Sequence, residues 1–110
     1  MINVCTLRSA VAGWLKTLAG EVAAEGVTVN MLLPGRLATD RTLSFDKMDA
    51  ESEGLSIETV AARSQSDIPV GRYGTPAEFG AAAAFLASRH AGYITGVALP
   101  IDGGLSRAML

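Results

Sequence analysis

Cysteine and clustered basic residues are scarce in this sequence. The single cysteine, Cys5, excludes an internal disulfide bond and fits a reducing cytoplasm, which is the location we expect. The formal net charge is -2, and no lysine or arginine cluster supplies the positive surface that nucleic-acid binding requires. We therefore expect no nucleic-acid partner.

Long hydrophobic runs are missing as well. No apolar stretch approaches the roughly 20 residues that span a bilayer, so we expect no membrane partner. The opening Met1-Ile2-Asn3 lacks the basic and apolar regions of a signal peptide, which favours a cytoplasmic protein. What the 110 residues do contain is 49% apolar and 18% charged side chains, a composition typical of a globular domain and not of a disordered segment.

An apolar stripe at helical spacing predicts a helix over residues 6–25. Gly26 follows it, at the position where helices often end on a left-handed residue. A helix this apolar normally packs against a sheet and a second helix together. The stripe consists of Leu7, Val11, Trp14, Leu15, Leu18, Ala19 and Val22.

The segment from Val27 to Leu33 is predicted to be a strand. Its near-continuous apolar run suits burial on both faces in a parallel sheet, with Asn30 as the polar exception. A sharp turn is expected at Pro34-Gly35, at the carboxyl end of this strand. Open α/β sheets bind their ligands at such strand ends.

Charged and hydroxyl-bearing residues dominate the region from about 38 to 67. A stretch of weak pattern this long inside a compact domain favours a lid or functional loop. We expect one or two short helices there, and residues 56–62 are the better candidate. The low density of apolar residues predicts that this lid is the most mobile interior segment.

The segment Thr75-Pro76-Ala77-Glu78 predicts a helix start, because Thr75 and Glu78 have the spacing of a capping box and proline favours the first helical position. The helix is predicted to run from Pro76 to about Ser88. Residues 89–96 should form a loop, and residues 97–101 a short final strand. The residues that the helix is expected to bury are Phe79, Ala82, Ala83, Phe85 and Leu86.

Three phrases occur in order along the chain: Val29-Asn30-Met31-Leu32-Leu33-Pro34-Gly35 with Thr39, then Ile68-Pro69-Val70-Gly71-Arg72-Tyr73-Gly74-Thr75-Pro76-Ala77-Glu78, and finally Leu99-Pro100-Ile101-Asp102-Gly103-Gly104. Together they resemble the C-terminal half of the short-chain dehydrogenase/reductase family, in particular its 3-oxoacyl-(acyl-carrier-protein) reductase-like branch. Phe85-Leu86-Ala87-Ser88 and Tyr93-Ile94-Thr95-Gly96 fit the same resemblance.

The resemblance implies an α/β fold, the C-terminal part of a doubly wound Rossmann-type fold. The implied order is long helix, parallel strand, lid, helix and parallel strand, in a single partial domain over residues 1–110. The family's N-terminal nucleotide-binding half, with its Gly-rich phosphate-binding turn, is missing. Intact relatives transfer hydride between NAD or NADP and a small-molecule carbonyl or alcohol.

The resemblance also implies a cofactor-binding turn at Pro34, Gly35, Leu37 and Thr39. In the family, the backbone near Leu37 and the hydroxyl of Thr39 would face the nicotinamide amide and the phosphates. Arg36 lies within this turn and has two interpretations. We favour a solvated side chain over one that meets an anionic substrate or phosphate.

The family's catalytic Tyr-x-x-x-Lys pair aligns with Val4 and Arg8. Valine cannot transfer a proton, so no catalytic residue is assigned. Arg8 stays charged and is a candidate to hydrogen-bond the ribose hydroxyls of the cofactor. For the remaining candidates, structural roles are favoured: Cys5 as an inert apolar residue, Trp14 and Tyr93 as packing residues, and Asp102 as a turn residue.

Two functions follow from this sequence. The first is an NAD(P)-dependent reductase-like chain that is truncated and inactive alone. The alternative is a non-catalytic association module or an inactive truncated gene product, and a Gly-rich βα unit encoded upstream would favour the enzyme. Since two parallel strands cannot cover their own faces, we expect a homo-oligomer or a complementary partner chain.

Overall fold

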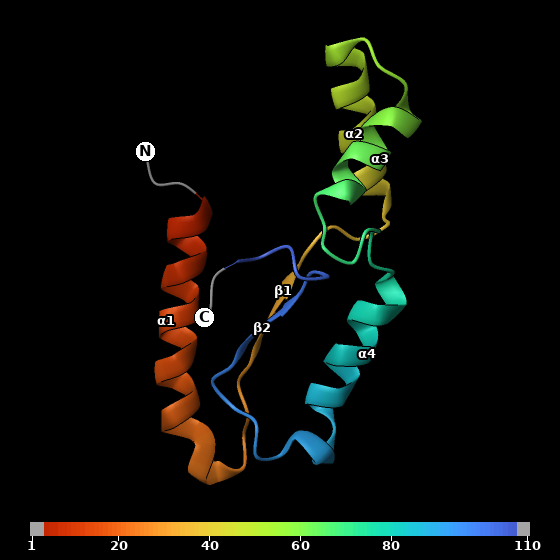
Figure 1. Cartoon of the computed structure of the whole chain (residues 1–110). Coiled ribbons are helices and arrows are strands. Elements are labelled where there is room, and N and C mark those ends of the chain that lie inside the picture. The colour runs from red at the N-terminus through yellow and green to blue at the C-terminus, as the bar shows by residue number, and fades with distance from the viewer. Residues whose placement is uncertain (1–3, 108–110) are drawn as a thin grey trace. The chain divides into compact units, whose positions relative to one another are not determined.

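Figure 1 shows the computed structural model, which describes residues 4–107. The chain has an α/β architecture, as predicted. Interpretations of the Val4 and Cys5 side chains concern atoms outside the described part. The elements are α1 (Val4–Val22), η1 (Ala23–Glu25), β1 (Met31–Pro34), α2 (Asp40–Glu53), α3 (Ile57–Ser66), α4 (Pro76–Ala87), η2 (Arg89–Ala91) and β2 (Ala98–Ile101).

The chain divides into two compact units. The first comprises Met1–Leu33 and Ala82–Leu99, and the second comprises Pro34–Ala81 and Pro100–Leu110. The division passes through β1, α4 and β2, so each unit holds part of these three elements. The single partial domain expected from the sequence stays a prediction.

The strands β1 and β2 pair in a two-stranded sheet. The Met31 amide donates to the Val97 carbonyl at 2.8 Å, and the Gly35 amide donates to the Ile101 carbonyl at 2.9 Å. From the first hydrogen bond to the second, both partners advance by four residues along the chain. The pairing is therefore parallel, as predicted.

The predicted strand over residues 27–33 is wrong at both ends. The strand begins at Met31 and includes Pro34, because the residues before Met31 bond to a loop instead of a strand. The Val29 amide donates to the Thr95 hydroxyl at 3.0 Å, and the Val29 carbonyl accepts from the Gly96 amide at 2.7 Å. Nor is the strand buried on both faces, since its first three residues are only half-buried and Pro34 is exposed.

Asn30 connects the approach to β1 with the segment before β2. Its side-chain amide donates to the Ile94 carbonyl at 3.1 Å, and its side-chain oxygen accepts from the Val97 amide at 3.1 Å. The polar exception in the apolar run is thus explained. One side chain serves two backbone groups that no strand partner reaches.

Replacing this side chain should destabilise the fold. We expect Asn30→Ala to lower the free energy of unfolding by about 1–3 kcal/mol, because two partly buried backbone groups lose their partner. Urea denaturation at a fixed chain concentration measures the change. Glu21→Ala, at an exposed position on α1, is the control. If the free energy of unfolding changed no more for Asn30→Ala than for Glu21→Ala, the stabilising role of the Asn30 side chain would be contradicted.

The helix predicted over residues 6–25 is confirmed as α1 followed by η1, and Gly26 ends it in the left-handed conformation with φ 78°. Its apolar stripe is covered only in part. Leu15 and Ala19 are buried, whereas Leu7, Val11 and Trp14 are exposed. Trp14 therefore does not pack within the described residues, and neither does the fully exposed Tyr93. The packing role predicted for both is wrong there.

The lid region contains two well-formed helices that lie side by side, α2 and α3 (Figure 1). The expectation of short helices is wrong for α2, which has 14 residues. Its ends are fixed locally, by the Thr39 side chain at the N-cap and by Gly54 with φ 68° at the C-cap. The pattern did not predict the full length of α2 because its large apolar residues, such as Leu43 and Met48, are exposed and form no buried stripe.

The helix predicted from Pro76 to about Ser88 is confirmed as α4, which ends one residue earlier. Its predicted burial is wrong, because none of its residues is buried. Phe85 is exposed, and the other four predicted core residues are half-buried. An apolar pattern identifies the helix, but burial depends on partners that residues 4–107 do not supply.

Candidate functional site

The carboxyl ends of β1 and β2 approach closely at Gly35. A Cβ atom on this residue would lie 2.5 Å from the Asp102 Cα and 2.6 Å from the Asp102 Cβ. Both distances are far inside van der Waals contact. Asp102 is fixed in turn, because its carboxylate accepts from the Gly104 amide at 3.0 Å and the Ser106 amide at 2.9 Å. The turn role predicted for Asp102 is therefore confirmed.

Because neither strand end can move freely, we expect Gly35→Ala to lower the free energy of unfolding by about 1–3 kcal/mol or more. Thermal melting at a fixed chain concentration measures it. Gly80→Ala, where an added Cβ meets nothing within 4 Å, is the control and should stabilise α4 slightly. Equal melting temperatures for Gly35→Ala and the unsubstituted chain would contradict the close approach.

The turn after β1 is held by the connector that precedes α4. Leu37 and Gly74 form an isolated parallel bridge. The Ala38 amide donates to the Gly74 carbonyl at 2.8 Å, and the Gly74 amide donates to the Arg36 carbonyl at 3.0 Å. The bridge fixes the backbone of this turn next to the connector.

Four of the five residues predicted to bind cofactor, Pro34, Gly35, Leu37 and Thr39, follow one another in this turn and belong to the second unit. The fifth, Arg8, is exposed on α1 in the first unit. A cofactor-binding role for all five stays a prediction.

The turn has hydrogen-bonding groups suited to a nicotinamide carboxamide. Among residues 4–107, no group accepts a hydrogen bond from the Leu37 amide, which leaves this donor available. The Thr39 hydroxyl is exposed and accepts from the Thr42 amide at 3.4 Å, as the N-cap of α2. The Thr42 hydroxyl donates its proton to the Leu37 carbonyl, so the contact of 3.3 Å between the Thr39 and Thr42 hydroxyls uses the Thr39 proton. Thr39 keeps a second lone pair, which can accept a hydrogen bond from a ligand. These residues fit the cofactor that the resemblance implies.

Arg36 is not the solvated side chain that we favoured. Its guanidinium donates to the Ser64 carbonyl at 2.7 Å and to the Ser64 hydroxyl at 3.0 Å, and it pairs with Asp67 at 3.6 Å. Arg36 therefore ties the turn after β1 to the end of α3. Sequence reasoning missed this contact because Arg36 and Ser64 are 28 residues apart.

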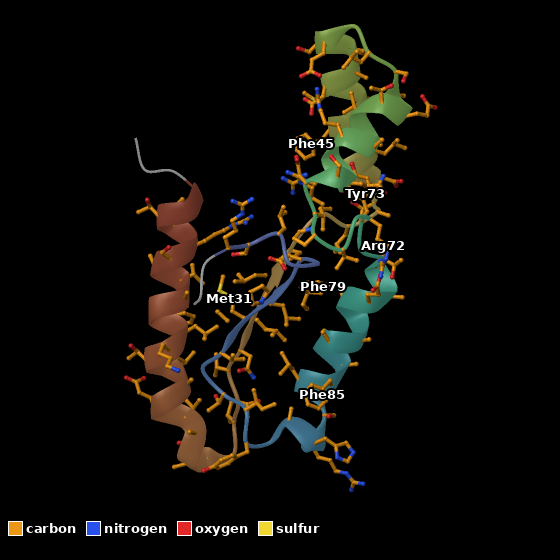
Figure 2. The ribbon with its side chains drawn as sticks, viewed as in Figure 1. Met31, Phe45, Arg72, Tyr73, Phe79 and Phe85 are labelled. Atoms are coloured by element: carbon orange, nitrogen blue, oxygen red, sulfur yellow. The ribbon has the colours of Figure 1, made fainter. Side chains whose placement is uncertain are left out.

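A cleft of about 360 Å³ opens between α2, α3 and the connector that precedes α4. Tyr73 lies at this cleft and points toward the α2–α3 pair (Figure 2). Its hydroxyl donates to both oxygens of the Asp46 carboxylate, at 3.1 and 2.9 Å. Burial raises the pKa of Tyr73, and the bond to Asp46 also raises it, against opposing effects of Ser64 and Arg36. Tyr73 therefore stays a hydrogen-bond donor at neutral pH.

Neither Asp46 nor Tyr73 was predicted as a site residue. They are 27 residues apart, and no motif links them. The sequence offered only a weak signal for this pair: an acidic residue in the lid region, Asp46, and a tyrosine just before the capping box, Tyr73. Many solvent-exposed pairs would give the same signal.

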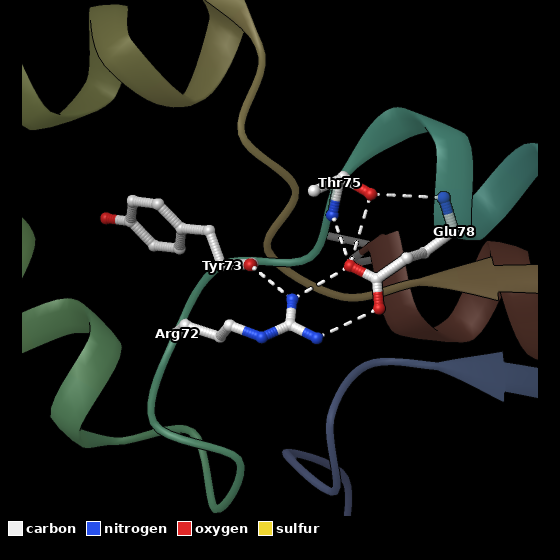
Figure 3. Close-up of polar contacts among 4 residues, drawn as sticks. All are labelled: Arg72, Tyr73, Thr75 and Glu78. Atoms are coloured by element: carbon white, nitrogen blue, oxygen red, sulfur yellow. Dashed lines mark hydrogen bonds and ion pairs between the residues drawn. The ribbon is translucent and has the colours of Figure 1, made fainter.

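The predicted capping box at the start of α4 is confirmed and extended by Arg72 (Figure 3). The Glu78 amide donates to the Thr75 hydroxyl at 3.1 Å, and the Thr75 amide donates to the Glu78 carboxylate at 3.0 Å. The Arg72 guanidinium donates to both oxygens of Glu78, at 2.8 and 3.0 Å. These bonds, first from Arg72 and then from Thr75, lower the pKa of Glu78 to about 2.

This network should lose its contribution in acid. A carboxyl group whose pKa is lowered by folding stabilises the folded state above its ordinary pKa and loses that effect as the pH falls. For Glu78 the window lies between its ordinary value of 4.5 and about 2. We expect the melting temperature to fall as the pH drops through this window, and to fall less for Glu78→Gln. Glu58→Gln, with an exposed carboxyl group on α3, is the control. Equal pH slopes for the unsubstituted chain and Glu78→Gln would contradict the prediction.

Two searches of residues 4–107 gave negative results. No group of three His, Cys, Asp or Glu side chains in this range is placed to hold a metal ion. No helix in the described part has the length and apolarity to cross a membrane.

The fold and the turn define a class of protein. The family model described as Enoyl-(Acyl carrier protein) reductase matches residues 3–106, so the chain belongs to this family. It is a member of the short-chain dehydrogenases/reductases, in the 3-oxoacyl-(acyl-carrier-protein) reductase-like branch, and its fold is the C-terminal part of a Rossmann-type fold.

Individual relatives agree. The 3-oxoacyl-(acyl-carrier-protein) reductase FabG of Haemophilus influenzae is 43% identical over 103 residues, which cover 94% of this chain and 38% of that protein. The structure of YwfH, an NADPH-dependent reductase involved in bacilysin biosynthesis, superposes with a TM-score of 0.83 at 35% identity, covering 92% of this chain and 38% of that one. Actinorhodin polyketide ketoreductase, solved with NADPH, gives a TM-score of 0.81 at 33% identity, covering 89% and 38%. The chain thus spans less than half the length of these relatives.

Proposed function

We propose that this chain is the C-terminal part of an NAD(P)-dependent reductase or dehydrogenase that acts on a small-molecule carbonyl or alcohol. Its turn after β1 faces the nicotinamide, and its helices α2 and α3 form the lid over the substrate. The available Leu37 amide beside the Thr39 hydroxyl, at the carboxyl end of β1, is the observation that carries this proposal.

Three residues of the turn have a defined part in this function. The Leu37 amide donates to the carboxamide of the nicotinamide, and the Thr39 hydroxyl bonds to the same end of the cofactor. Gly35 lets the ends of β1 and β2 approach, which fixes the turn's position. The cofactor, when bound, supplies the hydride. Val4, at the position of the family's tyrosine, cannot supply the proton.

An NMR titration of the 110-residue chain with NADPH tests the proposal. We expect chemical-shift changes at the amides of Leu37 to Thr39, with weak affinity because the nucleotide-binding half contributes nothing. Thr39→Val should reduce the changes, and Thr39→Ser should restore them. Thr17→Val, on α1, is the control. The proposal would be contradicted if NADPH shifted no amides of the turn, or if the chemical-shift changes were the same in Thr39→Val as in the unsubstituted chain.

The second candidate function is a non-catalytic association module in a cytoplasmic homo-oligomer. The exposed apolar residues of α1, Leu7, Val11 and Trp14, favour it. They recur at spacings of four and three residues and therefore share one helix face. The two functions are compatible, because an enzyme part can also associate through this face.

A further inference from the structure

Asp46 is a buried carboxylate that the proposed chemistry does not use. It is 7% exposed, and it lines the cleft between α2 and α3. Tyr73 bonds to both of its oxygens. Within residues 4–107, no arginine, lysine or histidine forms an ion pair with it.

This arrangement leaves the carboxylate short of partners. A carboxylate can accept about four hydrogen bonds, and a phenol supplies only one proton. Burying a charge is costly unless an opposite charge or several donors compensate it. The open positions of Asp46 therefore favour a ligand that brings a positive charge or strong donors into the cleft.

The walls of the cleft define the rest of such a ligand. Its volume of about 360 Å³ suits a small molecule of drug-fragment size. Apolar side chains, two threonine hydroxyls and the Asp40 carboxylate line it. The remaining lining residues are Ala38, Thr39, Asp40, Thr42, Leu43, Ile57 and Ala61.

We propose that this cleft binds a small ligand with an apolar body and a primary ammonium group, which Asp46 accepts and Tyr73 orients. The cleft includes Thr39, the residue assigned to the nicotinamide end of the cofactor. This inference rests on the proposed function, and it extends that function to the class of substrate that the intact enzyme accepts. The intact enzyme selects amine-bearing carbonyl or alcohol substrates over carboxylate-bearing ones.

Two probes of the same shape and opposite charge test this inference. Cyclohexylamine and cyclohexanecarboxylate are titrated into the ¹⁵N-labelled 110-residue chain at neutral pH. We expect the amine to shift the amides of Asp46, Ile57, Ala61 and Tyr73, and to bind about tenfold or more tightly than the carboxylate, as a charged hydrogen bond in a buried site implies.

Asp46→Asn should reduce this preference to about twofold or less, because the amide side chain has no charge to offer. Asp49→Asn, which removes the same charge from an exposed position of α2, is the matched control and should keep the preference. Tyr73→Phe keeps the carboxylate and should keep the preference too, with altered shifts. Equal affinities for the two probes in the unsubstituted chain overturn the proposal, whether or not Asp46→Asn folds.

The NADPH titration separates this inference from the proposed function. If the amine binds at Asp46 while NADPH leaves Leu37 and Thr39 unshifted, the cleft is a ligand site and the cofactor assignment is wrong. If NADPH shifts the turn and neither probe is preferred, the cofactor assignment stands and Asp46 only stabilises the α2–α3 pair.

Discussion

The 110-residue chain by itself is expected to leave NADPH unoxidised when a ketone substrate is added. Loss of a general acid/base alone typically costs a factor of about 10² to 10⁴ in rate. Here Val4 stands at the tyrosine position and Arg8 at the lysine position of the family's catalytic pair. The nucleotide-binding half is also absent from the chain, which covers 38% of the relatives' length. We therefore expect no oxidation above the buffer rate.

NADPH absorbance in the presence of a panel of ketones measures this, with an intact 3-oxoacyl-(acyl-carrier-protein) reductase as the positive control. Thr39→Val is the matched variant, since it removes the hydroxyl assigned to the cofactor. Steady oxidation that depends on the chain and is abolished by Thr39→Val would contradict the expected inactivity. Oxidation that survives Thr39→Val would indicate a contaminating enzyme.

Local signals in the sequence predicted the local structure well. The capping box of Thr75 and Glu78 spans four residues, so the hydrogen bonds it requires follow from the chain itself. The end of η1 at Gly26 is another local feature of this kind, because glycine adopts the left-handed conformation readily. Neither feature depends on what the rest of the chain does.

Contacts between distant residues could not be predicted in this way. Arg36 was interpreted as solvated because its partner Ser64 is 28 residues away. The hydrogen bond between Asp46 and Tyr73 was not predicted either, because these residues are 27 positions apart. The expected helices over residues 38–67 were short, and α2 is longer because its caps and a contact between Arg41 and the Phe45 ring, at 5.4 Å, support it without an apolar face.

The family resemblance predicted the turn of the candidate site but not the cleft beside it. Pro34, Gly35 and Thr39 lie in a phrase that the family shares, so their common turn followed from the match. The cleft depends on how α2 and α3 pack, and no phrase quoted for the resemblance covers these helices. Its acidic residue emerged only from the structure.

The second large effect concerns association, since the chain is not expected to persist as a monomer in water. The sheet that the structure describes between residues 4 and 107 has two strands, so each strand has an edge without a described partner. Unpaired edges invite association with other chains. In addition, Leu7, Val11 and Trp14 are exposed on one face of α1, and Trp14 is 65% exposed.

The magnitude supports association. Each large apolar side chain left in water forgoes about 1.5–3 kcal/mol. Leu7, Val11 and Trp14 are 49–65% exposed, so covering them recovers about half of that amount each, together about 2–5 kcal/mol. This is a large part of the lower end of a small domain's total stability, about 5–15 kcal/mol. Covering this face with a second copy of the chain or with a complementary chain recovers that free energy.

Analytical ultracentrifugation over a dilution series measures the outcome. We expect the unsubstituted chain to sediment as a species larger than a monomer at micromolar concentration and to dissociate on dilution. Trp14→Glu places a charge on the exposed apolar face and should shift dissociation to higher concentration by about tenfold or more, because a buried unpaired charge costs several kcal/mol. Thr17→Glu, which adds the same charge at an exposed polar position of α1, should shift it less. A monomer with a cooperative thermal transition at micromolar concentration would show that the chain is a self-sufficient domain, and would contradict the association role of α1.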